Sequence, residues 1–318
     1  ERRAPRPPAA LGDLMRNEVS GYENCLAAML SRTGGAMPAR LHLAIKTTEP
    51  VVGFEADGWT RYLTLHGERA FVIGGGCDTC AFVFERKKSN YLSPTTFAER
   101  LAAGVGLLDD DLVGAAGSLL PTGDYAVAEF NIEPSLTGPC QPDDYFSHES
   151  LDLFGMPSYG GVPDNPRISY WRARTRLLPP GTGAWPAREG PRPRPTNPKY
   201  FFQFVVPLEP PQHLDPERIE HFQRQMEAGA QPAALGVSVL DVRAPAVTPG
   251  GKDETTYVYA EHWCLATYLL DGHHKVEAAA RSHRAVRLLT FVARDVSVAS
   301  EQDIDAVVQM LANGQDPG

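Results

Sequence analysis

The residues best suited to chemistry lie together in the segment Asp271-Gly272-His273-His274-Lys275. A carboxylate at this position could hold a metal ion or accept a proton, and two imidazoles and an amine could contact phosphate. The glycine lets the backbone come close to a ligand. The simpler alternative is an ordinary Asp-Gly turn followed by solvated histidines.

The flanking sequence predicts that this turn connects a strand to a helix. An apolar run at residues 267–270 precedes it, and an alanine-rich stretch of good helix-forming residues follows it. The first amides of such a helix have no partner within the helix, and the helix dipole adds partial positive charge there. The turn is therefore a candidate site for an anionic group beside Asp271.

The elements that must position this turn can be predicted from hydrophobic spacing and capping residues. An apolar strand ends at a proline and Glu209, and Asp215 followed by Pro216 is a typical helix start. In chain order, the predicted elements are a strand at 200–209, a helix from 216, a strand at 235–242, the 271–275 turn with its helix, a strand at 286–292 and a helix at 302–311.

This order of elements, with its Asp-Gly-His-His-Lys turn, resembles the ParB/sulfiredoxin superfamily, and most closely its ParB-like free-serine kinases, over about residues 200–295. The resemblance implies that Asp271 and Glu209 are catalytic and activate the substrate hydroxyl. It also implies that nucleotide phosphate or magnesium is bound by Gly272, His273, His274 and Lys275, with Asp271 as a possible magnesium ligand. Lysine stands where arginine is usual, which keeps the charge but loses the bidentate fork.

The function implied by the resemblance is phosphoryl transfer from ATP or ADP, with magnesium, to a hydroxyl of a small metabolite such as an amino acid. The sulfiredoxin reaction is not expected, because that reaction needs a cysteine where this chain has Gly272 and His273. One alternative is a nucleotide-binding regulatory or interaction protein without catalysis. Another is a zinc-stabilised scaffold in which the turn has no function.

A Cys-x-x-Cys pair, Cys77 and Cys80, follows three glycines and forms a second candidate site. Such pairs hold zinc or exchange with a redox partner. A structural zinc needs two more ligands, which could be Cys140 with His148, or Cys25 could contribute. The other interpretations are a dithiol redox pair and two small buried residues at a hairpin.

Composition and charge limit the classes of partner. The chain has 318 residues, 42% of them hydrophobic and 22% charged, and a net charge of -9. An acidic surface disfavours nucleic acid, and no apolar run reaches the ~20 residues of a membrane span. Five cysteines are few and odd in number, which favours a reducing cytoplasm over a disulfide framework. The expected partners are a nucleotide and a small-molecule substrate.

The predicted fold class is α+β. We expect a disordered tail at residues 1–12, an N-terminal domain with a mixed, mostly antiparallel sheet at 13–178, and a proline-rich linker or strap at 179–199. A ParB/sulfiredoxin-like domain is expected at 200–318. The N-terminal domain would cover the C-terminal one or supply substrate contacts.

Overall fold

The computed structural model describes residues 39–87, 110–139, 141, 143–146, 149, 153, 168–178, 198–244 and 260–313. All of them belong to one compact unit, Met37–Gly318. The tail predicted at residues 1–12 and nearly all of the strap predicted at 179–199 lie outside the described residues.

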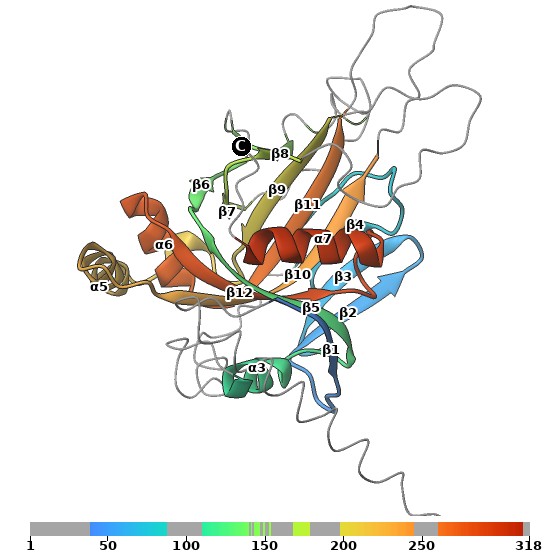
Figure 1. The fold of residues 1–318 in the computed structure, drawn as a ribbon, viewed down its shortest axis with the longest axis horizontal. Coiled ribbons are helices and arrows are strands. Elements are labelled where there is room, and N and C mark those ends of the chain that lie inside the picture. Colours follow the sequence, from blue (N-terminus) through green and yellow to red (C-terminus); the bar gives the residue numbers. More distant parts are fainter. Residues whose placement is uncertain are drawn as a thin grey trace, which may run out of the picture. The chain divides into compact units, whose positions relative to one another are not determined.

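Nine of the described strands form one large mixed sheet, in the order β1-β5-β12-β10-β11-β9-β7-β6, with β8 also paired to β9 (Figure 1). Their bounds are β1 (Arg40–Ile45), β5 (Gly123–Ile132), β6 (Ser135–Thr137), β7 (Tyr170–Arg172), β8 (Arg176–Leu177), β9 (Lys199–Val206), β10 (Ala233–Arg243), β11 (Glu261–Asp271) and β12 (Val286–Ala293).

Both halves of the chain contribute strands to this sheet. The C-terminal half supplies the centre, β12-β10-β11-β9, in which β10 is parallel to β12 and antiparallel to β11, and β9 is parallel to β11. The N-terminal half supplies both margins, because β5 pairs with β12 and β7 pairs with β9. The predicted division into separate domains at 13–178 and 200–318 therefore does not match the strand pairing.

A smaller antiparallel sheet consists of β2 (Val52–Asp57), β3 (Thr60–Leu65) and β4 (Glu68–Gly75). These strands are joined by short connections, as the closely spaced apolar runs in this part of the sequence predict. The helix α3 (Asp110–Gly117) precedes β5.

The remaining described helices are η1 (Pro211–His213), α5 (Pro216–Glu227), α6 (His273–Ser282) and α7 (Glu301–Ala312). The prediction for α5 is confirmed, because the Asp215 side chain caps it by accepting a hydrogen bond from the Glu217 amide, and Pro216 is its first residue. Ser300 and Asp303 form a capping box at the start of α7.

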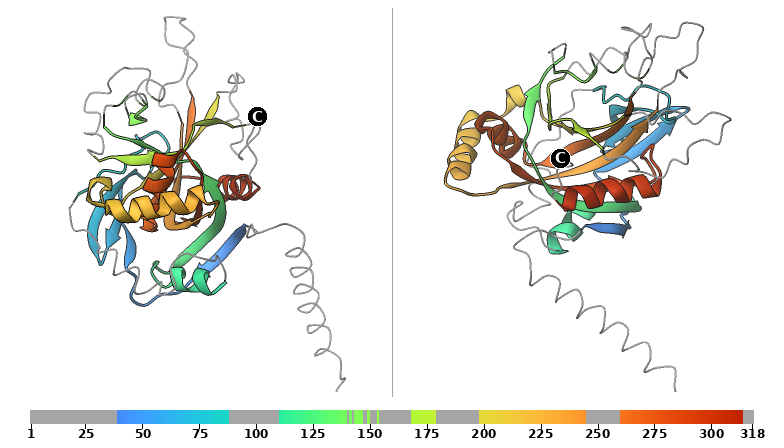
Figure 2. Two further views of the ribbon diagram at one scale, coloured as in Figure 1. Left: turned by 90° about the vertical axis from the view of Figure 1, so that its left-hand side faces the viewer. Right: turned by 45° about the horizontal axis from the view of Figure 1, so that its top comes forward.

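The large sheet has a hydrophobic core on each face, because side chains alternate along each strand. On β10, Leu235, Val237 and Val239 face the core shared with the small sheet. Leu240 and Val242 face the core shared with α5, α6 and α7. The small sheet and α7 accordingly lie on opposite sides of the large sheet (Figure 2, left).

The observed fold confirms the predicted α+β class, with a large mixed sheet, a separate antiparallel sheet and few helices. The narrower assignment of residues 200–318 to the ParB/sulfiredoxin fold stays a prediction. Among the described helices, none combines the length and the apolar character needed to cross a bilayer.

Candidate functional site

The predicted turn lies where β11 ends and α6 begins. Gly272 caps α6 with φ of 97°, a left-handed conformation that side-chain-bearing residues rarely adopt. A Cβ atom at this position would lie 2.6 Å from Cβ and 2.8 Å from Cα of Ala234 on β10. The turn therefore requires glycine because of its backbone conformation and the close approach of β10.

The two histidines of the turn hold a neighbouring segment in place. Nε2 of His273 accepts hydrogen bonds from the backbone amides of Leu208 and Glu209, at 3.1 and 3.2 Å. Nε2 of His274 accepts one from the amide of Asp215, at 3.1 Å. Both rings thus connect the start of α6 to the β9–α5 connection.

An imidazole nitrogen that accepts a hydrogen bond carries no proton, so these contacts require neutral rings. Burial lowers the pKa of His273 to about 4, and the smaller effect of Asp271 in the opposite direction does not offset it. Burial also lowers the pKa of His274. The predicted contact of these residues with phosphate or metal stays a prediction, and at neutral pH it would use backbone amides or Nδ1 rather than a cationic ring.

The two predicted catalytic carboxylates come from neighbouring segments. Strands β9 and β11 are parallel and adjacent, with Val206 opposite Tyr268, so their C-terminal ends lie at the same edge of the sheet. His273, two residues after Asp271, bonds to the Glu209 amide. The fold therefore brings together the two segments that sequence analysis linked only by resemblance.

Glu209 and Asp271 have different surroundings. Burial raises the pKa of Glu209, with His213 and Arg218 acting in the opposite direction, and its Oε2 is buried without a hydrogen-bond partner in the described part of the chain. Oδ2 of Asp271 lies 3.4 Å from Nζ of Lys275, one helical turn away. Glu209 is thus the carboxylate with spare acceptor capacity, and Asp271 is already ion-paired.

Positive groups lie around both carboxylates. The Lys275 ammonium, predicted to contact phosphate, lies 5.8 Å from the centre of the Phe222 ring and pairs with Asp271. Arg218 acts electrostatically on both Glu209 and His274. Arg86 donates to the carbonyl oxygens of Pro207 and Leu208, at 2.7 and 3.1 Å. The edge thus combines carboxylates with cations, as a phosphate site with a metal would require.

The second candidate pair, Cys77 and Cys80, forms a disulfide in the loop after β4. Disulfide sulfurs are not thiolates, so the pair cannot hold zinc while it is bonded, and a zinc site at Cys77 and Cys80 stays a prediction for the reduced pair. The other proposed ligands, Cys25, Cys140 and His148, lie outside the described residues, within which no group of three or more His, Cys, Asp or Glu residues could hold a metal ion. The expectation of reduced cysteines is corrected at this pair.

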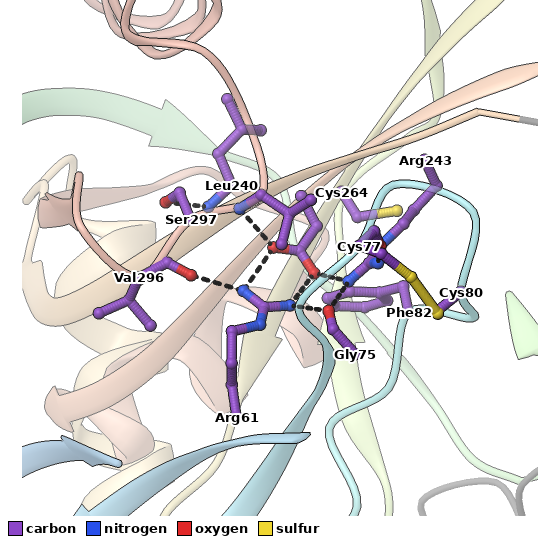
Figure 3. Close-up of polar contacts among 12 residues, drawn as sticks. Arg61, Gly75, Cys77, Cys80, Phe82, Leu240, Arg243, Cys264, Val296 and Ser297 are labelled. Atoms are coloured by element: carbon purple, nitrogen blue, oxygen red, sulfur yellow. Dashed lines mark hydrogen bonds and ion pairs between the residues drawn. A yellow bond between two sulfur atoms is a disulfide. The ribbon is translucent and has the colours of Figure 1, made fainter. Parts of the chain in front are cut away.

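A buried ionic cluster that sequence analysis missed lies beneath that loop (Figure 3). Arg61 from β3 and Arg243 from β10 both bind the carboxylate of Asp241, with Arg61 nitrogens at 3.0 and 2.6 Å from its oxygens. Burial alone would raise the pKa of Asp241, but the charges of Arg243 and Arg61 outweigh it and lower that pKa. The sequence did contain a sign of this cluster. Residues 241 and 243 are both charged and lie on the same face of an otherwise apolar strand.

These two regions lie at opposite ends of the central strands. In the β10–β11 register, Leu235 is opposite Asp271 at one end, and Arg243 is opposite His262 at the other. A rise of about 3.3 Å per residue separates the ends of β10 by more than 20 Å. The 271–275 turn and the Cys77–Cys80 loop are therefore distinct sites.

Comparisons of the chain with protein-family models, curated proteins and solved structures give no match. The resemblance to the ParB/sulfiredoxin superfamily therefore stays a prediction from the residues that suggested it.

Proposed function

We propose that this protein is a nucleotide-dependent kinase that phosphorylates a hydroxyl of a small, amino-acid-like metabolite at the edge formed by Glu209 and residues 271–275. The observation that supports this most directly is the pair of hydrogen bonds from the Leu208 and Glu209 amides to His273. They hold a partly buried carboxylate beside the N-terminus of α6, where a second carboxylate and a lysine also lie.

The proposed roles follow from charge and hydrogen-bonding capacity. Glu209 accepts the proton of the substrate hydroxyl, because its pKa is raised by burial and one of its oxygens has no partner among the described residues. The first amides of α6, Lys275 and Arg218 contact phosphate oxygens. Phosphoryl transfer depends mainly on positioning and charge neutralisation, which this combination of groups suits.

The residues present fit a magnesium ion, since this ion is usually held by one or two protein carboxylates together with substrate phosphates. Asp271 would hold it together with the phosphates of the nucleotide, which leaves the unpaired oxygen of Glu209 to accept the proton. When bound, magnesium would neutralise charge on the phosphates of ATP or ADP. In the absence of nucleotide, Lys275 neutralises Asp271.

The test combines calorimetric titration with an assay of phosphoryl transfer. ATP and ADP are titrated with and without magnesium, and hydroxylated amino acids and related metabolites are then screened as acceptors. We expect saturable, magnesium-dependent binding, and a fall in transfer rate of at least about 100-fold in Glu209→Gln and in Asp271→Asn. The matched control is Glu220→Gln, which removes an exposed carboxylate on α5. Transfer at the wild-type rate in both site variants would refute the proposal.

The second candidate is a nucleotide-responsive regulatory protein without catalysis. The ion pair between Asp271 and Lys275 favours it, because a carboxylate held by an ammonium group is a poorer base. In that case nucleotide binds without turnover and changes the oligomeric state or partner binding. Lys275→Met would then weaken nucleotide binding, with no transfer detected in any variant.

A further inference from the structure

The Cys77–Cys80 disulfide is not explained by the proposed kinase site, which lies at the other end of β10. Both cysteines are only partly buried. Their sequence separation is three, and a disulfide that closes so short a loop constrains the unfolded chain far less than one that closes a long loop. Stabilisation of the fold is therefore a weak explanation for this bond.

The loop is held at several points that do not involve the sulfur atoms. The Gly76 amide donates to the carbonyl of Trp59 at 2.7 Å, and the Ala244 amide donates to the carbonyl of Asp78 at 2.9 Å. Arg61 and Arg243 donate to the carbonyl of Gly75 at 3.0 and 3.2 Å. These contacts do not depend on the disulfide, so cleavage of the S–S bond would leave both sulfurs near each other.

The cluster beneath the loop carries excess positive charge. Two guanidinium groups, those of Arg61 and Arg243, share the single carboxylate of Asp241, and all three side chains are buried. Arg243 also donates to the carbonyl of Cys77 (Figure 3). The Nε atoms of both arginines are buried without an acceptor among the described residues. An anion at the Cys77 end of the loop would therefore lie close to the Arg243 guanidinium.

Two acidic groups near the loop, Asp78 and Glu149, also affect its charge. Asp78, within the loop, is partly buried and adds one negative charge. Glu149 accepts a hydrogen bond from the Phe82 amide, and burial raises its pKa to about 8, so it is mostly neutral at pH 7. The charges near the loop are therefore balanced in number, and what favours a thiolate at Cys77 is the contact of the Arg243 guanidinium with the carbonyl oxygen of the same residue. The thiolate is the form of cysteine that attacks and leaves in thiol–disulfide exchange.

The remaining described cysteine has the opposite environment. Cys264 on β11 is buried, its thiol donates to the hydroxyl of Tyr145 at 3.4 Å, and burial raises its pKa well above the usual value. It is therefore protonated at neutral pH and inaccessible to a reagent. Redox reactivity among the described cysteines is confined to the pair at residues 77 and 80.

We propose that Cys77 and Cys80 form a redox-active disulfide that exchanges reversibly with an external dithiol, and that the Arg61–Asp241–Arg243 cluster stabilises the reduced form. A thiolate of the external dithiol forms a bond to one sulfur of the pair, the S–S bond breaks, and its electron pair leaves on the other sulfur as a thiolate. The second thiol of the reductant then releases the mixed disulfide. The protein pair gains two electrons and two protons overall, and the external dithiol becomes a disulfide.

The first test uses dithiothreitol on the native, full-length protein, followed by alkylation with iodoacetamide and peptide mass analysis. We expect alkylation of Cys77 and Cys80 without alkylation of Cys264, and restoration of the disulfide after addition of oxidised dithiothreitol. A bond that is reduced only in denaturant would overturn the proposal, because it would then be structural. So would two free thiols that remain unpaired in excess oxidised dithiothreitol.

The second test measures how the alkylation rate of each thiol depends on pH, in Cys80→Ser and in Cys77→Ser. At least one thiol is expected to have a midpoint one unit or more below the ~8.5 of an unperturbed cysteine. Adding Arg61→Met, which leaves the Asp241–Arg243 pair intact, should reduce the alkylation rate at pH 7 about tenfold. Arg69→Met is the matched control, since Arg69 lies on β4 but is exposed and pairs with Glu55 and Asp57.

If Arg61→Met does not fold, the pH profiles of Cys77→Ser and Cys80→Ser are sufficient to test whether the reduced form is stabilised. Midpoints at or above ~8.5 for both thiols would overturn the proposed stabilisation of the reduced form. None of these measurements involves nucleotide. A result that overturns the redox proposal therefore leaves the kinase proposal untouched, and the reverse also holds.

Discussion

His273 at the candidate site has a structural role that its residue type does not reveal. His273 offers Nε2 to two backbone amides and so joins Glu209 to α6. The ring must stay neutral to do this, because a protonated imidazole has no acceptor. His273, which sequence analysis considered as a ligand, therefore holds the segment that carries Glu209, the proposed catalytic carboxylate.

The neutral state of His273 makes the free energy of unfolding depend on pH. Its pKa is about 4 in the folded protein, whereas an unfolded chain would have about 6.5, so the unfolded state binds more protons between these values. The stabilisation is complete above pH 6.5 and is lost as pH falls towards 4. We expect a loss of about 2 kcal/mol between pH 7 and pH 5, measured by urea unfolding.

The variant His273→Leu should remove this dependence and also destabilise the protein at pH 7, by about 1–3 kcal/mol for each buried amide left without an acceptor. His221→Gln is the control, because His221 is exposed on α5 and its Nε2 lies 2.9 Å from the side-chain amide of Gln225 on the same helix. An unchanged pH dependence in His273→Leu would contradict the assignment.

At the scale of secondary structure, the site depends on how β11 changes into α6. The strand ends at Asp271, and the helix starts at His273. The single residue between them, Gly272, adopts the left-handed backbone conformation. The close approach of Ala234 leaves no room for a side chain at that glycine. The turn is therefore fixed by the packing of β10 against it, and His273 at the start of α6 accepts a hydrogen bond from the Glu209 amide.

Substitution of two glycines with similar φ angles would distinguish two contributions to the free energy of unfolding. One is the strain of a left-handed backbone, and the other is the steric clash of an added Cβ atom. Gly272→Ala and Gly229→Ala both place a side chain at positive φ, 97° and 91°, which costs about 1–3 kcal/mol. Only Gly272→Ala also brings its Cβ within 2.6 Å of another atom, because nothing lies within 4 Å of the Cβ position at Gly229. We expect Gly272→Ala to lower the free energy of unfolding by at least about 1 kcal/mol more. Equal effects in urea unfolding would show that packing at Ala234 does not matter.

At the scale of the molecule, both halves of the chain build the same layers. Strand β5 completes the sheet beside β12, and β7 completes it beside β9. The indole of Trp171 on β7 donates to Glu277 on α6 at 2.8 Å, inside the core that α6 shares with the sheet. The central strands of the C-terminal half would have exposed edges without the N-terminal half.

This shared sheet predicts one cooperative unfolding transition rather than two. Far-UV circular dichroism and tryptophan fluorescence should give coincident urea curves, since Trp171 and Trp263 are buried in the two halves. A fragment ending at residue 178 and a fragment beginning at residue 199 should each fail to fold alone. Two separate midpoints, or a stable fragment, would instead support the two-domain division predicted from the sequence.

Local patterns in the sequence were enough to predict the central strands and their helices. The alternation along β10, the Asp215-Pro216 start of α5 and the turn at Gly272 all appear close to their predicted positions. These features depend on neighbouring residues, so they can be read without knowledge of long-range contacts. The placement of Glu209 near the turn was inferred only through a resemblance, because two segments more than 60 residues apart carry no local sign of contact.

The sequence by itself determined the α+β class, the order of the central elements and which residues are candidates for chemistry. Only the tertiary structure decided that the histidines of the turn accept backbone amides, that Cys77 and Cys80 are bonded, and that Arg61 and Arg243 share Asp241. It also decided that the two halves form one sheet. The physical reason is that local preferences follow from adjacent residues, whereas hydrogen-bond partners, burial and pKa shifts depend on groups that meet only after folding.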